Sequence, residues 1–228
     1  MKHIALSLAV AAAGMTMFAP ADAPAAPAPA GFYEMDLSHT SVTFRIDHLG
    51  LSRYTGQFTR ATGKLSFDPA NPAAQSVSAV IDATSLQTNY PEPAKLDFDA
   101  QIRKQFLATE TYPQIIFKST KVEMTGSSTA RVTGDFTLHG VTRPVTLETT
   151  FNGGYPKGAM DPTAARIGFS AHGTFKRSDF GMKQFVPPPG THFGVGDEIE
   201  VIIETEFAMK YSLPRLTRQG ATGVLTPA

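Results

Sequence analysis

Cysteine and tryptophan are both absent from this chain of 228 residues. Without cysteine the protein has no disulfide, no thiolate ligand for a metal, no cysteine nucleophile and no acylated cysteine as a membrane anchor. The folded state must therefore be stabilised by packing and hydrogen bonding.

An excess of either charge is also absent. Lysine plus arginine and aspartate plus glutamate number 20 each, so the formal net charge is zero. No basic stripe is present that would neutralise a phosphate backbone. We therefore expect no nucleic-acid partner.

A long hydrophobic run occurs only at the start of the chain. Lys2 precedes the apolar segment Ile4 to Phe18, and an Ala/Pro-rich segment follows with small-residue cleavage sites such as Ala28-Pro29-Ala30. The apolar segment is shorter than the ~20 residues of a membrane span. We expect residues 1–30 to be a signal peptide with its cleavage region, at an undetermined cleavage position, and the mature protein to be soluble and periplasmic.

Segments of alternating apolar and polar residues, separated by turn residues, fill the chain after Gly31. Alternate side chains of a strand share a face, so each segment predicts a strand with one apolar face. The chain contains about eight long strands of this kind, the number that closes a barrel around side chains or one small ligand. The prediction is an all-β, extended, eight-stranded antiparallel barrel over residues 31–210, with a bulge near Arg60 and a disordered tail at residues 211–228.

One segment has helical periodicity instead. Between Asp97 and Leu107 the apolar residues Phe98, Ile102 and Phe106 recur every four positions, and acidic residues occupy the first turn. This pattern predicts an amphipathic helix. Its placement stays open between a lid or plug over one end of the barrel and the outside of the sheet.

His48 ends an apolar stripe that begins with Val42, Phe44 and Ile46. A polar side chain beside an apolar interior needs a hydrogen-bond partner in the protein or in a ligand. His48 is therefore predicted either to bind the polar head of a ligand, with Arg53 and Asp179 as neighbours at the mouth, or to hold the following loop by a hydrogen bond.

Patterns typical of catalysis or metal binding are missing. The histidines after residue 30 have no spacing such as HExxH, and a metal site from His39, His48 and His192 is only a minor alternative. A Ser52, His48 and Asp47 triad fails because Asp47 and His48 face opposite sides of one strand. No GxSxG motif or phosphate-binding glycine loop occurs. We expect no catalytic residue, no metal and no covalent cofactor.

Four segments, in order along the chain, resemble one known family. They are 44–58, 105–119, 134–145 and 177–182, with sequences that include FRIDH, YPQIIFKS, GDFTLHGVTRPV and RSDFGM. They are similar to the YceI family of bacterial polyisoprenoid-binding proteins over about residues 32–209. The resemblance implies a lipocalin-like barrel whose elongated apolar cavity holds a long-chain isoprenoid or similar amphiphile without catalysis, and it makes a homodimer worth testing.

The inward stripes and this resemblance together predict a cavity for a polyprenyl, quinone or fatty-acid derivative. The alternative is a filled barrel that acts as a non-enzymatic interaction module of the cell envelope. Small inward residues, among them Ala79, Gly134 and Ala171, either leave room for a ligand or let a neighbouring side chain pack closely. The expected cavity-lining residues are Phe44, Ile46, Phe67, Ile81, Phe106, Phe117, Phe136, Leu138, Phe169, Phe175, Phe180 and Ile203.

The segment from Arg177 to Gly196 is rich in apolar residues yet irregular, and three consecutive prolines stiffen it. It is predicted either to form a rim that contacts a membrane or the exposed part of a lipid, or to fold its own aromatic side chains under itself.

Overall fold

The computed structural model describes residues 27–210, which form ten strands, one α-helix and three short 3₁₀ helices. The predicted tail and most of the predicted signal peptide lie outside these residues. The strands are β1 (Gly31–His48), β2 (Ser52–Phe58), β3 (Ala61–Phe67), β4 (Ser76–Asp82), β5 (Leu86–Gln87), β6 (Gln114–Met124), β7 (Thr129–Leu138), β8 (Val141–Tyr155), β9 (Arg166–Lys176) and β10 (Val195–Met209). The helices are α1 (Phe98–Gln105), η1 (Pro72–Ala74), η2 (Ala83–Ser85) and η3 (Arg177–Phe180).

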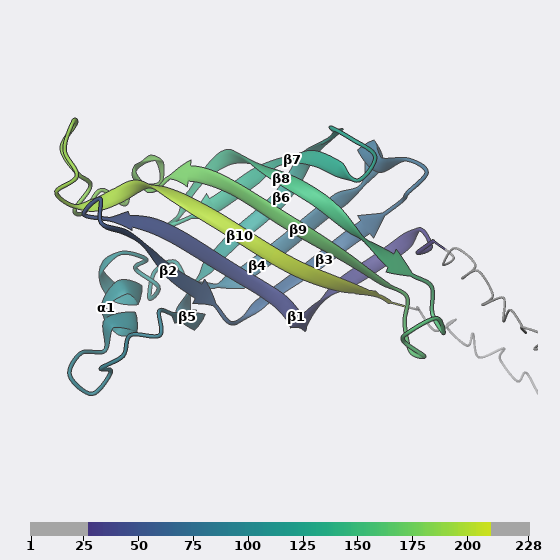
Figure 1. Ribbon diagram of the computed structural model, residues 1–228, viewed down its shortest axis with the longest axis horizontal. Helices are drawn as coiled ribbons and strands as arrows, with labels where there is room; N and C mark the ends of the chain where they lie inside the picture. Colours follow the sequence, from purple (N-terminus) through teal and green to yellow (C-terminus); the bar gives the residue numbers. More distant parts are fainter. Residues whose placement is uncertain (1–26, 211–228) are drawn as a thin grey trace, which may run out of the picture.

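The strands form one antiparallel sheet that closes when β10 pairs with β1 (Figure 1). β2 and β3 follow one another with a break at Thr59 and Arg60, and both lie against β1. They thus act as one long strand, and β5 is a two-residue extension that pairs with β2. The predicted closed barrel of eight long strands is confirmed. Near Arg60, where a bulge was predicted, the structure has a break between β2 and β3 instead.

The sheet opens on one side, near one end of the barrel. β4 pairs with β6 as far as Asp82 and Gln114, but beyond η2 the chain turns away to pair with β2. α1 follows β5 and lies at this end (Figure 1). The side chain of Asp97 caps α1 by accepting a 2.8 Å hydrogen bond from the amide of Ala100, which satisfies a free donor of the first turn. Within residues 27–210, no helix has the length and hydrophobicity of a membrane span.

Two clusters of buried side chains pack the two ends of the barrel. The cluster at the α1 end consists of Ala83, Leu86, Leu107, Ile115, Leu138, Val145, Phe180 and Met182. The cluster at the opposite end consists of Ala28, Tyr33, Leu65, Phe67, Ala165, Ile167 and Phe207. These clusters supply the apolar burial that a chain without disulfides needs.

Some of the small inward residues let a neighbouring side chain pack closely, and others leave room inside the barrel. A Cβ atom on Gly134 would lie 2.5 Å from Cζ of Phe117, so this glycine lets the phenylalanine ring cross the strand. By contrast, Ala79 and Ala171 face the interior space of the barrel. Their small side chains leave room there.

Candidate functional site

A cavity of about 750 Å³ lies inside the barrel. Every long strand and α1 contribute to its wall, from Phe98 and Gln101 of α1 to Ser127 and Ser128 in the turn between β6 and β7. Most of the wall is apolar. The barrel is hollow, which argues against the filled-barrel alternative.

The predicted lining residues, apart from Phe180, lie on the wall of this cavity. They share the inward face of their strands or of the α1 segment. These residues are Phe44, Ile46, Phe67, Ile81, Phe106, Phe117, Phe136, Leu138, Phe169, Phe175 and Ile203.

Phe180 belongs to the packed core instead. Its side chain is 1% exposed, and its ring meets the rings of Phe136 and Phe175 edge to face, at 5.4 Å between centroids in both cases. The prediction that it lines the cavity is wrong because η3 interrupts the strand pattern after β9, so side-chain direction no longer follows strand alternation. Phe180 supports the wall from behind.

His48 lies at the α1 end of the cavity, where β1 ends. Its carbonyl oxygen accepts a hydrogen bond from the amide of Leu51, while its imidazole has no hydrogen bond to any residue within 27–210. The loop is therefore held by the backbone of His48 and not by its side chain. The imidazole remains available to a ligand.

Two polar residues that the sequence reasoning missed join His48. Tyr54 lies opposite Ile46 on β2, and its ring meets the ring of Phe98 edge to face at 5.9 Å. Gln101 lines the same end from α1. Strand alternation from Phe58 back to Tyr54 would have predicted that Tyr54 faces inward. The position of Gln101 at the cavity could be known only from the packing of α1.

Arg53 and Asp179 do not line the cavity, so the prediction that they neighbour His48 at its mouth is wrong. Arg53 pairs with Asp47 on the outer face of the β1–β2 hairpin, and its Nη1 donates a 2.8 Å hydrogen bond to Glu200. The hairpin register, with His48 opposite Ser52, directs Arg53 outward. Asp179 is exposed on η3.

Arg177 is a buried cation beside the cavity, with 2% of its surface exposed. Its guanidinium donates hydrogen bonds of 2.8 Å to three main-chain oxygens, those of Met182, Val195 and Gly196. Burial lowers the pKa of Arg177, and the charge of Asp197 opposes this effect. Because these bonds occupy all three guanidinium nitrogens, the role of Arg177 is to hold the loop between β9 and β10.

α1 closes the open side of the sheet, as in the lid-or-plug placement. Phe98, Ile102 and Phe106 all contribute to the cavity wall. Nη1 of Arg103 donates to the carbonyl oxygen of Leu86 at 3.2 Å. A carboxylate oxygen of Asp99 also accepts a 3.0 Å hydrogen bond from the amide of Thr88. These polar contacts fasten the plug to the segment that includes β5.

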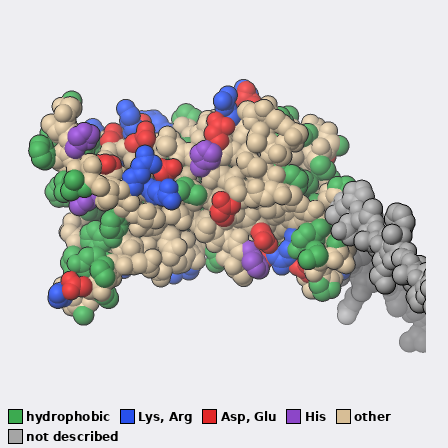
Figure 2. All heavy atoms as spheres, in the orientation of Figure 1, with side chains coloured by type: hydrophobic (Ala, Val, Ile, Leu, Met, Phe, Trp, Pro, Cys, Tyr) green, Lys and Arg blue, Asp and Glu red, His purple; other side chains and the backbone are tan. Residues whose placement is uncertain are grey.

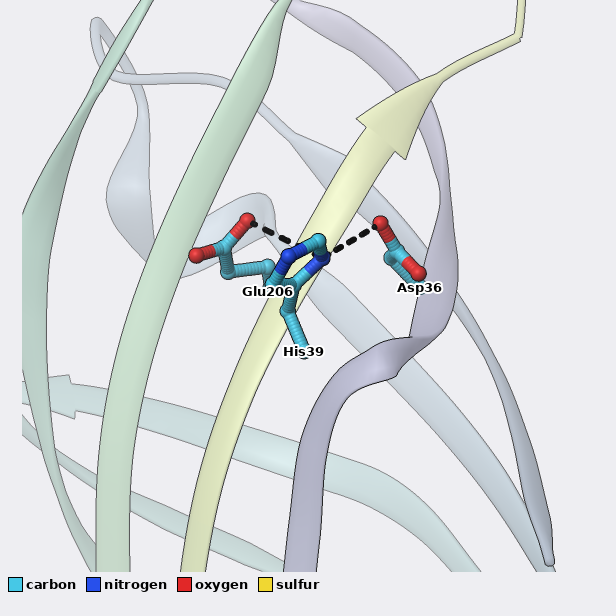
Figure 3. A group of neighbouring side chains, drawn as sticks. All are labelled: Asp36, His39 and Glu206. Atoms are coloured by element: carbon cyan, nitrogen blue, oxygen red, sulfur yellow. Dashed lines mark hydrogen bonds and ion pairs between the residues drawn. The ribbon is translucent and has the colours of Figure 1, made fainter.

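Asp36, His39 and Glu206 gather near the bulge of β1 (Figure 3). Nδ1 of His39 lies 3.0 Å from Asp36 and 4.0 Å from Glu206. The guanidinium of Arg166 contacts both carboxylates, hydrogen-bonding Asp36 and lying 3.6 Å from Glu206. A cation therefore already neutralises this cluster, which makes it an ion-pair network on the barrel surface.

The charged groups of this network shift the pKa values of Asp36 and His39. Hydrogen bonds from Arg166 and then His39 hold the pKa of Asp36 far below its usual range. The hydrogen bond to Asp36 and the charge of Glu206 raise the pKa of His39. His39 and His48 are about 25–30 Å apart along β1 at ~3.3 Å per residue, so a shared metal site with His192 is excluded.

The sequence of this chain matches one protein family. The sequence model of the family described as the YceI-like domain matches residues 33–207. This chain belongs to the YceI-like family. Protein YceI of Escherichia coli is 40% identical over 169 residues, which cover 74% of this chain and 81% of that protein.

Two solved structures have a similar fold. The YceI protein of Campylobacter jejuni superposes with a TM-score of 0.59 at 27% identity, over 73% of this chain and 91% of that chain. A domain from Saccharophagus degradans, described as a polyisoprenoid binding domain, superposes with a TM-score of 0.58 at 14% identity, over 78% of this chain and 98% of that chain.

Proposed function

We propose that this YceI-like protein binds a long-chain isoprenoid or a similar amphiphilic lipid, such as a polyprenyl, quinone or fatty-acid derivative. The observation that carries the proposal is the apolar cavity of about 750 Å³ inside the barrel. Each methylene buried there stabilises the complex by ~0.8 kcal/mol, so a tail needs no hydrogen bond along its length. The description of the Saccharophagus relative as polyisoprenoid binding supports the same ligand class.

The head of the ligand lies at the α1 end in this proposal. His48, Tyr54 and Gln101 there supply an imidazole, a phenol and an amide on one side of an otherwise apolar space. Such a set gives hydrogen-bond donors and acceptors to a carbonyl, hydroxyl or phosphate head. The tail then runs between the phenylalanine side chains toward the β6–β7 turn.

The protein carries or sequesters its lipid without chemical change, and it does so in the periplasm. The geometry beside His48 is consistent with this role, since the Asp47 carboxylate accepts a hydrogen bond from the amide of Gly50 and faces away from the imidazole. The lipid is bound without a covalent bond. A homodimer stays a prediction, which sedimentation velocity tests.

Native mass spectrometry of the full-length protein, expressed and processed in a lipid-replete host, tests the proposal. We expect a bound hydrophobic molecule that organic solvent releases. If repeated preparations carry none, and fluorescent fatty-acid and polyprenyl probes do not bind either, the proposal fails.

Ala171→Phe gives a sharper test, because Ala171 faces the cavity from β9. The larger side chain should occupy space that the tail needs and weaken probe binding at least tenfold. Thr174→Phe is the matched control, since Thr174 is exposed on the same strand. Equal probe binding by both variants would contradict a ligand inside the barrel.

Substitutions at the α1 end of the cavity test the proposed contacts with the polar head of the ligand. His48→Ala and Tyr54→Phe should each weaken probe binding about fivefold, the equivalent of one hydrogen bond of ~1 kcal/mol, with little change in melting temperature. His172→Ala is the control because His172 is exposed on the outer face of β9. A large loss of stability with unchanged binding would show that His48 serves the fold instead.

A further inference from the structure

Two loops at the α1 end present large apolar side chains to solvent. Leu49 and Leu51, in the turn between β1 and β2, are 43% and 83% exposed. Phe185 and Phe193, in the loop between β9 and β10, are 68% and 85% exposed. These four residues are called the apolar rim below, and Figure 2 shows hydrophobic side chains on the projections at this end.

The two loops form one connected surface. The amide of Leu49 donates to the carbonyl oxygen of Gly194 at 2.9 Å, and the amide of Val195 donates to the carbonyl oxygen of Phe185 at 2.7 Å. Leu49 and Phe185 both have a positive φ, of 58° in each case, which a side chain rarely adopts unless its surroundings hold it. The backbone thus fixes the rim residues in their exposed positions.

The rim is continuous with the cavity. Phe185 is exposed to solvent and also lines the cavity, where its ring lies 5.9 Å from the ring of Phe106. An apolar path therefore leads from the outer surface to the interior of the barrel. A tail that follows this path avoids exposure to water.

The charged residues of the two loops indicate which kind of surface the apolar rim can bind. Residues 49–51 and 183–194 contain no aspartate or glutamate, whereas Lys183 is exposed and makes no ion pair with any residue of 27–210. His192, next to Phe193 in sequence, is exposed too. The Asp47 carboxylate at the base of the β1–β2 turn already accepts a hydrogen bond from the amide of Gly50. An exposed lysine among apolar side chains complements an anionic lipid surface.

We propose that the protein docks this end onto an anionic lipid bilayer, with the apolar rim inserted between head groups and Lys183 against lipid phosphates. The inference rests on the proposed function, because the bilayer is where a lipid ligand enters or leaves the cavity. Docking places the cavity mouth against the bilayer.

The absence of tryptophan makes insertion directly measurable. Phe193→Trp introduces a single fluorophore at the rim, and Phe32→Trp introduces one at the opposite end of the barrel, where Phe32 is 75% exposed. On addition of vesicles of phosphatidylethanolamine and phosphatidylglycerol, we expect a blue shift and quenching by brominated acyl chains for F193W alone. No response of F193W, or equal responses of both variants, would overturn the proposal.

Polar substitutions test the energetics in vesicle co-sedimentation. The double variant Leu51→Ser with Phe193→Ser should bind these vesicles at least tenfold more weakly, the equivalent of ~1.4 kcal/mol or more. The matched control joins Phe32→Ser with Met160→Ser at the other end, where Met160 is 79% exposed, and should bind as the unmodified protein does. Lys183→Glu should weaken binding only when phosphatidylglycerol is present.

Probe binding in solution separates the two proposals. Vesicle binding that fails while fluorescent lipid probes still bind would overturn docking and leave the lipid-binding function intact. Rim-dependent vesicle binding without any probe binding would overturn the function and leave docking intact. If rim variants bind vesicles normally but lose a cross-link to an envelope protein, the rim is a protein interface and the proposal is overturned.

Discussion

Nη1 of Arg177 donates a 2.8 Å hydrogen bond to the carbonyl oxygen of Met182. The same guanidinium reaches the carbonyl oxygens of Val195 and Gly196, so one side chain joins both ends of the loop between β9 and β10. The Asp197 carboxylate accepts hydrogen bonds from the amide and hydroxyl of Ser178, which closes the same base. The position of the apolar rim thus depends on a buried arginine.

Replacement of Arg177 by methionine should lower the free energy of unfolding by about 3 kcal/mol or more, because three buried carbonyl oxygens lose their donors. Urea denaturation followed by circular dichroism measures the change. Arg177→Lys should recover only part of it, since an ammonium lacks the planar fork that serves several acceptors at once. A loss below ~1 kcal/mol for Arg177→Met would show that the bonds contribute little.

Phe180 and Ile203 should respond differently to truncation. Phe180→Ala leaves a void in a packed cluster and should cost about 3–5 kcal/mol, without removing a side chain that lines the cavity. Ile203→Ala removes atoms from a wall that already faces open space, so it should cost less and admit a bulkier tail. Chemical denaturation and the binding of lipid probes of increasing chain width test both expectations. Equal stability losses would contradict the distinction between core and wall.

The contacts of α1 should set how fast a ligand leaves. Arg103→Ala removes the hydrogen bond to the carbonyl oxygen of Leu86 and should speed probe release several-fold in stopped-flow fluorescence, because the plug opens more easily. Lys104→Ala is the control, since Lys104 is exposed one residue further along α1. Unchanged release from the Arg103 variant would mean that ligands leave by another route.

The pKa of His39 leads to a dependence of stability on pH. Asp36 and Glu206 raise the pKa of His39 in the folded state. The protonated imidazole therefore stabilises the fold fully at a pH below about 6.5, the pKa of His39 in the unfolded chain. This stabilisation is lost as the pH rises through the higher pKa that His39 has in the folded protein. The unmodified protein should therefore exceed His39→Gln in stability at about pH 5.5 and match it at about pH 9. Thermal melts across this range test the prediction. The exposed His172→Gln should show no such trend.

Residues before β1 contribute to packing, which bears on the predicted cleavage of a signal peptide. Ala28 is buried among the side chains of the cluster opposite α1, and the hydroxyl of Tyr33 donates a 2.6 Å hydrogen bond to the carbonyl oxygen of Pro29. We expect the mature protein to retain Ala28, so cleavage falls before it and not after Ala30. Intact-mass measurement of the processed protein decides this, and a mature chain that begins at Gly31 would contradict it.

Strand alternation in the sequence determined the inward faces of this barrel. Phe44, Phe136 and Ile203 could be placed on the cavity wall because burying alternate apolar residues admits only one orientation of each strand. The number of long strands then indicated closure, and the structure agrees.

Only the tertiary structure decided what lies where alternation stops. The hairpin register turned Arg53 outward, η3 took Phe180 into the core, and the packing of α1 placed Gln101 on the wall of the cavity that His48 also lines. Turns and helix placement depend on contacts between distant segments, which a local pattern does not contain. The apolar wall of this protein is thus determined by its sequence, whereas the fold decides which polar side chains join His48 and which residues of the apolar rim reach solvent.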